Sequence, residues 1–161
     1  MNQAVLLLGC NIGDRENYLV QAINALKKEV GTITDFSSIY ESEPWGFHCE
    51  TSFLNQVVIA ETTISPDQLL VQIQGVEREL GRVRSKEGYE SRTMDIDILF
   101  YNDLILDTEN LKIPHPEIPN RRFALLPLAE ILSFKMHPIL KKTIKKLLIE
   151  CDDKLWVKKY S

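Results

Sequence analysis

The stretch RVRSKEGYESRTMDIDILFY, residues Arg82–Tyr101, joins a cationic loop to a strand that carries two aspartates. Because side chains alternate along a strand, Asp95 and Asp97 point to the same side. Leu99 and Tyr101 are expected on that side too, and the opposite face collects Met94, Ile96, Ile98 and Phe100. Residues two apart on a strand are roughly 6–7 Å apart. Each carboxylate can therefore hold one side of a pair of metal ions about 3.5–4 Å apart.

The same alternation is also typical of a half-buried strand with one wet face. Asp is a poor strand residue, however, and two neighbouring carboxylates repel each other unless a cation lies between them. Arg82, Arg84 and Arg92 come just before the pair, and the planar fork of arginine suits phosphate oxygens. Carboxylates, arginines and a glycine-bearing loop together favour a site for a magnesium–polyphosphate substrate.

Length and composition narrow the class of protein. A chain of 161 residues is typical of one domain that buries about 70 % of its unfolded surface. The net charge of −4 argues against a general nucleic-acid binder. No apolar run approaches the roughly 20 residues that span a bilayer, and no signal-peptide pattern opens the chain. Three cysteines without metal-ligand spacing suit a reducing compartment. We therefore expect a single domain over residues 1–161, cytoplasmic, with neither membrane nor nucleic acid as partner.

Apolar periodicity predicts the order β-α-β-β-α-β. The expected elements are a strand at Ala4–Gly9, a helix through Leu19–Val30 capped by Asp14, strands at Thr32–Tyr40 and Phe53–Thr62, a helix from Ser65 to Gly81 and the strand Met94–Tyr101. This order is the ferredoxin-like pattern, an α+β fold with a mainly antiparallel sheet. Downstream, Leu104–Leu106 is expected to form a hairpin with the strand Met94–Tyr101 across a turn at Asn102-Asp103. A short helix is expected at Pro127–Leu132 and a last helix at Pro138–Glu150, so that helices cover both faces.

One polar residue stands out in the strand Phe53–Thr62. Phe53 and Asn55 share a face, along with apolar residues. An amide offers both a donor and an acceptor, which suits the edge of a heterocycle. A core asparagine bonded within the protein explains the pattern equally well. The preceding loop, Glu41–His48, is rich in Pro, Gly and aromatic residues, a composition seen in functional loops held by a rigid scaffold as well as in plain surface loops.

Four runs of sequence, taken together, carry a resemblance to a known family. They are GCN at Gly9–Asn11, GRVR at Gly81–Arg84, RTMDIDIL at Arg92–Leu99, and IPHP at Ile113–Pro116 followed by RRFALLPLAEI at Arg121–Ile131. In this order and spacing the chain resembles the 6-hydroxymethyl-7,8-dihydropterin pyrophosphokinases of folate biosynthesis over essentially its whole length.

The resemblance implies transfer of the terminal pyrophosphate of ATP to the pterin hydroxymethyl group, with release of AMP. It implies two Mg²⁺ ions bound by Asp95 and Asp97, with Arg82 and Arg92 neutralising the phosphate oxygens. The other residues implied on the nucleotide side are Gln74, Arg84, Tyr89, Ile98, His115 and Arg121. Those implied on the pterin side are Ser42, Pro44, Trp45, Phe53, Asn55 and Phe123, with the two phenylalanines enclosing the ring. Such an enzyme is expected to act as a monomer on small molecules alone.

Two other functions are compatible with parts of the pattern. A two-metal phosphodiesterase or nucleotidyl transferase would use the same aspartate pair without any pterin. A non-catalytic RNA-binding module on a ferredoxin-like fold would need aromatic residues on adjacent strands and a basic surface. The net acidity of the chain argues against the second.

Overall fold

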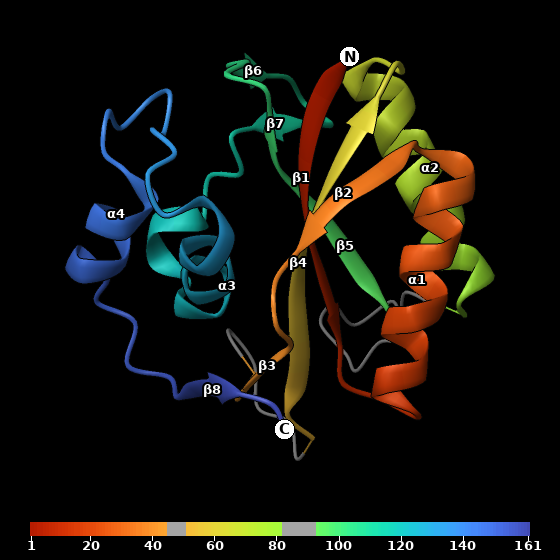
Figure 1. Ribbon diagram of the computed structural model, residues 1–161, viewed down its shortest axis with the longest axis horizontal. Helices are drawn as coiled ribbons and strands as arrows, with labels where there is room; N and C mark the ends of the chain where they lie inside the picture. The colour runs from red at the N-terminus through yellow and green to blue at the C-terminus, as the bar shows by residue number, and fades with distance from the viewer. Residues whose placement is uncertain (45–50, 82–92) are drawn as a thin grey trace.

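The computed structural model describes residues 1–44, 51–81 and 93–161. Its main sheet runs in the order β5-β1-β4-β3-β8, and β2 also pairs with β4 (Figure 1). The strands are β1 (Asn2–Cys10), β2 (Thr32–Phe36), β3 (Tyr40–Ser42), β4 (Phe53–Thr62), β5 (Asp95–Tyr101) and β8 (Val157–Lys159). All of these pairings are antiparallel. The predicted ferredoxin-like α+β fold is confirmed.

Helices cover both faces of the sheet, as Figure 1 shows. The helices are α1 (Arg15–Glu29), α2 (Pro66–Glu79), α3 (Arg122–Leu132) and α4 (Ile144–Glu150), with a 3₁₀ turn η1 (Ile118–Asn120) before α3. The α1 and α2 side holds one apolar cluster, and the α3 and α4 side holds the other. β1 contributes to both clusters, which explains why its sequence is a nearly unbroken apolar run.

The predicted starts of the first two helices are confirmed. The side chain of Asp14 accepts a hydrogen bond from the amide of Asn17 and caps α1. Ser65 and Gln68 form a reciprocal capping box at the start of α2, with a proline in the first turn. Gly81 follows α2 at φ +88°, a left-handed backbone conformation that glycine adopts without steric cost.

The strict alternation predicted along β5 fails after Ile98. The register against β1 shifts between Val5 and Leu6, so that Leu6 pairs with Ile98 but Val5 pairs with Phe100. The extra residue is Leu99, and such a bulge moves every later side chain to the opposite face. Phe100 therefore packs in the α3 and α4 cluster, whereas Tyr101 packs in the α1 and α2 cluster. Asp95 and Asp97 precede the bulge, so they still share a face.

Two of the expected β elements need correction. The strand predicted at Thr32–Tyr40 is split into β2 and β3. The hairpin predicted at Leu104–Leu106 does not form: instead β6 (Leu106–Asp107) pairs with β7 (Lys112–Ile113). The reason lies at Asn102, whose amide donates to the carbonyl of Gln3 at 2.8 Å and whose side chain accepts from the amide of Gln3 at 2.8 Å. With Asn102 bonded to β1, the chain turns away from β5.

Two predicted helices have different limits. α3 begins at Arg122 instead of Pro127, and Pro127, which has no amide hydrogen, lies inside it. The last helix begins at Ile144 instead of Pro138, with the side chain of Thr143 as its cap. Upstream, the ring nitrogen Nδ1 of His137 accepts from two successive amides and stabilises a turn in place of a helix.

The C-terminal strand β8 was not predicted. It pairs with β3, whose other neighbour is β4. Its three residues VKK show none of the apolar alternation that marks a strand. Among the described residues, every helix is too short or too polar to span a bilayer.

Candidate active site

The strand register places the predicted metal ligands, Asp95 and Asp97, on the same face of the sheet as Asn55, which is predicted to bind the edge of the pterin. Gly9 on β1 pairs with Asp95 on one side and with Asn55 on the other. Residues that pair across strands share a face, and Asp95 and Asn55 are two strand spacings, roughly 10 Å, apart. In the next row Leu7 pairs with Asp97 and lies in the α3 and α4 cluster. The carboxylates and Asn55 therefore face the side from which α3 approaches.

Gly9 has no side chain, so the space between Asp95 and Asn55 across the three strands stays unfilled. A Cβ atom at this position would lie 3.4 Å from Oδ1 of Asn55 and 3.9 Å from the ring of Phe53. Any side chain at Gly9 would therefore occupy the space between Asp95 and Asn55. Sequence reasoning noted the glycine only as part of a motif, because its role depends on which residues pair with it.

Asp97 lies beside two cationic or potentially cationic side chains. Its carboxylate oxygens are 3.9 Å from Nε2 of His115 and 3.9 Å from Nη1 of Arg121. Burial, with the nearby Arg121 guanidinium adding to it, lowers the pKa of His115 to about 4, so this ring is neutral near pH 7. Nδ1 of His115 accepts from the amide of Glu117 at 3.1 Å, which leaves the proton on Nε2, the atom that faces Asp97.

Asn55 is buried and bonded within the protein. Its Nδ2 donates to Oγ of Ser42 at 2.7 Å and to the carbonyl of Tyr40 at 3.4 Å. Ser42 is buried as well, and Phe53, on the same face as Asn55, is half-buried. The structure thus brings three of the predicted pterin residues together and gives the amide nitrogen of Asn55 two protein acceptors. Pro44 is also half-buried and follows β3 by two residues.

The N-terminal end of α3 supplies the opposite side of this region. Phe123 is half-buried and packs against the α3 and α4 cluster. The guanidinium of Arg121 lies 5.6 Å from the centre of the Phe123 ring, within the range of a cation–π interaction. Arg121 therefore contacts both Phe123 and Asp97, which links the predicted pterin residue to the predicted metal ligand.

Two predicted nucleotide residues are not gathered around the carboxylates. The side chain of Ile98 packs in the cluster on the α1 and α2 face. Gln74 is exposed on α2, which covers that same face. Five further predicted residues lie outside the described part of the chain: Trp45, Arg82, Arg84, Tyr89 and Arg92.

The donors on β5 fit a magnesium ion that is bound together with a polyphosphate. In residues 1–44, 51–81 and 93–161, no three His, Cys, Asp or Glu side chains gather closely enough to hold a metal ion by themselves. Mg²⁺ is usually bound by one or two carboxylates, with phosphate and water oxygens completing its octahedron. Asp95 and Asp97 offer two carboxylates on one face, and both are only half-buried. The pair therefore suits a metal that arrives with its phosphates.

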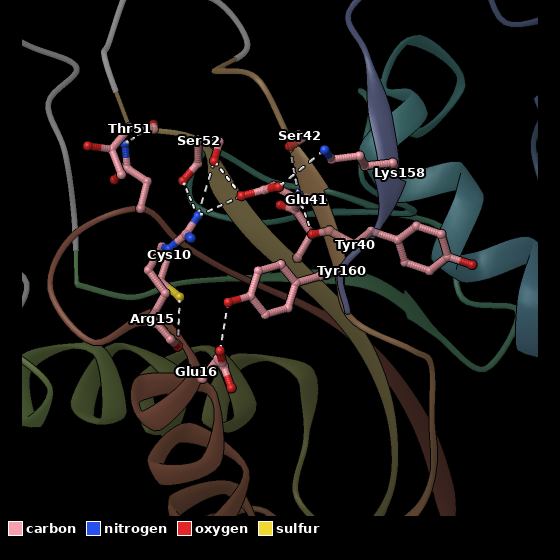
Figure 2. A network of polar contacts seen from close by, with 12 residues as sticks. Cys10, Arg15, Glu16, Tyr40, Glu41, Ser42, Thr51, Ser52, Lys158 and Tyr160 are labelled. Carbon is pink, nitrogen blue, oxygen red and sulfur yellow. Dashed lines mark hydrogen bonds and ion pairs between the residues drawn. The ribbon is translucent and has the colours of Figure 1, made fainter.

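A second polar network, on the α1 face of the sheet, was missed by sequence reasoning. Nη1 of Arg15 lies 3.2 Å from Oε2 of Glu41 and donates to the carbonyl and the hydroxyl of Ser52 at 3.0 and 3.1 Å. Ser52 in turn donates to Glu41 at 2.8 Å. Figure 2 shows these three side chains converging, with Lys158 approaching Glu41 from β8. The network joins the chain just before Ser42 to the chain just before Phe53. No local motif could have revealed it, since its members are distant in sequence.

The fold and the site define a class of protein: a ferredoxin-like domain with a carboxylate pair on the edge strand β5, on the same sheet face as a buried amide and a half-buried phenylalanine. The family model described as 7,8-dihydro-6-hydroxymethylpterin-pyrophosphokinase (HPPK) matches residues 5–133, and the chain belongs to this family.

Similar proteins agree with this assignment. The chain is 42 % identical over 145 residues to the 2-amino-4-hydroxy-6-hydroxymethyldihydropteridine pyrophosphokinase of Aquifex aeolicus, covering 90 % of this chain and 89 % of that protein. It is 46 % identical over 131 residues to the enzyme of the same name from Bacillus subtilis, covering 81 % and 78 %. Among solved structures, the HPPK-DHPS of Plasmodium falciparum superposes with a TM-score of 0.74 at 21 % identity over 92 % of this chain. The match spans only 43 % of that longer chain, and at this identity it shows the fold alone.

Proposed function

We propose that Asp95 and Asp97 bind the magnesium ions that hold ATP while the chain transfers pyrophosphate from ATP to the hydroxymethyl group of 6-hydroxymethyl-7,8-dihydropterin, releasing AMP. The transfer is the activity of the family to which the chain belongs. The observation that carries the assignment of residues is the row across the sheet, in which Gly9 separates Asp95 from Asn55. A pterin lying over Gly9 would place its hydroxymethyl group, which accepts the pyrophosphate, toward Asp95. Its ring would lie toward Asn55.

The pterin pocket is assigned to Ser42, Phe53, Asn55 and Phe123, with Pro44 and Trp45 completing it. A flat, neutral heterocycle binds by stacking on aromatic rings and by a few hydrogen bonds at its edge. Phe53 and Asn55 share one face of β4, and Phe123 comes from α3 on that face. Because Asn55 is held by Ser42 and Tyr40, its orientation is set before the substrate arrives.

The triphosphate side needs positive charge more than a strong base. Attack by a primary alcohol on a phosphoryl group depends on in-line positioning and on neutralising the phosphate oxygens. Two bound Mg²⁺ ions would supply most of that neutralisation. Arg82, Arg92 and Arg121 are the cationic residues assigned to the same oxygens, with Arg84 on the nucleotide. His115 would bind a phosphate oxygen as a neutral donor through Nε2, since burial keeps its pKa low.

The remaining assignments concern the chain as a whole. We assign the adenosine contacts to Gln74, Tyr89 and Ile98, and we expect one domain over residues 1–161 that acts as a monomer on small molecules. The net charge of −4 supports the absence of a nucleic-acid partner. A cytoplasmic location is supported by Cys10 and Cys151, which are both free thiols.

The test is an assay of AMP formation with and without the pterin. We expect AMP from ATP only when Mg²⁺ and 6-hydroxymethyl-7,8-dihydropterin are both present, together with one equivalent of the pterin pyrophosphate. AMP formed at the same rate without pterin would overturn the proposal and would favour a two-metal phosphodiesterase.

A further inference from the structure

The C-terminal segment Cys151–Tyr160 lies beyond residues 5–133, which the family model matches. Its first contact is with α3. Oδ2 of Asp153 accepts from the backbone amide of Arg122 at 3.0 Å, and Oδ1 accepts from the amide of Leu155 at 3.0 Å. Arg121, the residue at the N-cap position of α3, makes no capping hydrogen bond with its own side chain. The carboxylate that caps α3 therefore comes from 31 residues further along the chain.

This cap lies next to the pterin side of the proposed site. Arg121 and Phe123 flank the capped amide, and Arg121 is 3.9 Å from Asp97. A cap bonds otherwise unpaired amides of the first turn, and a carboxylate also interacts favourably with the helix dipole. Loss of Asp153 would therefore loosen the turn that positions Phe123.

The same segment then runs along β3. The amide of Trp156 donates to Oε1 of Glu43 at 2.8 Å, and the amide of Glu43 donates to the carbonyl of Trp156 at 3.4 Å. Val157 pairs in register with Ser42, whose hydroxyl accepts from Asn55. Figure 1 shows β8 beside β3 at the lower end of the sheet. This strand thus gives the three-residue β3 a second hydrogen-bonded neighbour.

Side chains at the end of the segment tie it to α1 and to the base of β3. Nζ of Lys158 lies 4.0 Å from Oε1 of Glu41. The hydroxyl of Tyr160 donates to Oε1 of Glu16 at 2.6 Å, and the Tyr160 ring lies 5.8 Å from the guanidinium of Arg15 (Figure 2). The segment is therefore held at both ends, at α3 by Asp153 and at α1 by Tyr160.

We propose that the segment Cys151–Tyr160 acts as a brace that positions the two walls of the pterin pocket, Phe123 on one side and Ser42 with Asn55 on the other, and that Asp153 is its main positioning residue. The inference rests on the proposed function, because it takes these residues as the pterin walls. A pocket whose walls are fixed in advance binds its ligand without a further cost of ordering. The brace is thus expected to affect pterin recognition more than nucleotide recognition.

The test compares Asp153→Ala with two matched variants in the steady-state AMP assay. We expect Asp153→Ala to raise the pterin KM up to about tenfold, because the first turn of α3, which carries Phe123, loses its capping bond, and to raise the KM for ATP much less. Asp153→Asn keeps one acceptor oxygen, which can retain the bond from the amide of Arg122 but not the one from Leu155 as well, and should give a pterin KM between those of Asp153→Ala and wild type. Asp152→Ala removes an exposed neighbouring carboxylate and should behave as wild type.

A merely structural role predicts a different pattern. Equal rises in the KM for pterin and for ATP with a lowered melting temperature, or no change in either KM, would overturn the brace. If Asp153→Ala does not fold, Lys158→Ala is tested in its place, because the side chain of Lys158 is 69 % exposed. Loss of this one surface ion pair is expected to raise the pterin KM alone, by about twofold. An unchanged pterin KM in that variant would contradict the proposal. If the wild-type chain makes no pterin-dependent AMP, the proposed function is overturned as well. If wild-type turnover is normal, variants that depart from the expected KM values count against the brace alone.

Discussion

The two sides of the site differ in how far their polar groups are exposed to solvent. On the amide side, Asn55 and Ser42 are 2 % and 1 % exposed and are joined by a hydrogen bond of 2.7 Å. On the carboxylate side, the side chain of Asp97 is 29 % exposed and lies 3.9 Å from both His115 and Arg121. The amide side is closed to solvent, and the carboxylate side is partly open to it.

The difference follows from the charge of the ligand expected on each side. A neutral ring brings little electrostatic energy, so its pocket must be shaped and oriented beforehand. A magnesium–triphosphate brings its own cations, and two carboxylates buried without them would repel each other and lose hydration. The carboxylates are therefore expected to stay near solvent until the metal binds.

The largest effect is expected at the carboxylate side. Asp97→Ala should lower turnover by about 10³-fold or more, because loss of a metal ligand removes several kcal/mol of charge stabilisation in the transition state. The fold should survive, since the side chain of Asp97 is partly exposed to solvent. The AMP assay and thermal unfolding measure the two outcomes. Asp107→Ala, which removes an aspartate whose side chain is 81 % exposed, serves as the control; equal turnover in both variants would remove the metal role from Asp97.

A smaller effect is expected at the pterin side. Phe123→Ala should weaken pterin binding by roughly 1–3 kcal/mol through lost stacking and burial, and should change the affinity for a non-hydrolysable ATP analogue less. Equilibrium titration with each ligand gives the comparison. Phe134→Ala, at a phenylalanine that is 80 % exposed, should bind both ligands as wild type does. Equal losses for the two ligands in Phe123→Ala would argue against a ring that encloses the pterin.

The smallest effect concerns stability near the base of β3. The hydrogen bond from Ser52, helped by Arg15 and opposed by burial, lowers the pKa of Glu41 below 4.5. The folded state therefore releases this proton more readily than the unfolded state, and the stabilisation is fully present above pH 4.5 and is lost as the pH falls through the lowered pKa. The free energy of unfolding of Glu41→Gln should thus be lower than that of wild type at pH 7, and the two should lie much closer together at pH 3. A difference that is the same at both pH values would show that the charge of Glu41 does not matter.

Much of the fold could be predicted because its signals are local. The capping residues Asp14 and Ser65 and the apolar run of β1 each act within a few residues, and each predicted its element correctly. The errors lie where distant contacts prevail. The bulge at Leu99 depends on pairing with β1, the turn at Asn102 depends on Gln3, and the early start of α3 is accompanied by a cap from Asp153.

The candidate site divides in the same way. Asp95 and Asp97 could be placed on one face from the period of a strand alone, and the structure agrees. Their alignment with Asn55 could not, because it depends on the register of β4 and β5 against Gly9. Nor could the sequence place Ile98 and Gln74 relative to the carboxylates, since that depends on which face each helix covers.

The sequence by itself determined the chemistry of this protein: an aspartate pair on one strand, arginines before it, and motifs that identify the family. These follow from residue types and short spacings, which act whatever the rest of the chain does. Only the tertiary structure decided which residues meet across the sheet, that Asn55 is held by Ser42, and that a C-terminal strand lies against β3. Such contacts join segments far apart in the chain, and their energies depend on the register and packing of the whole sheet.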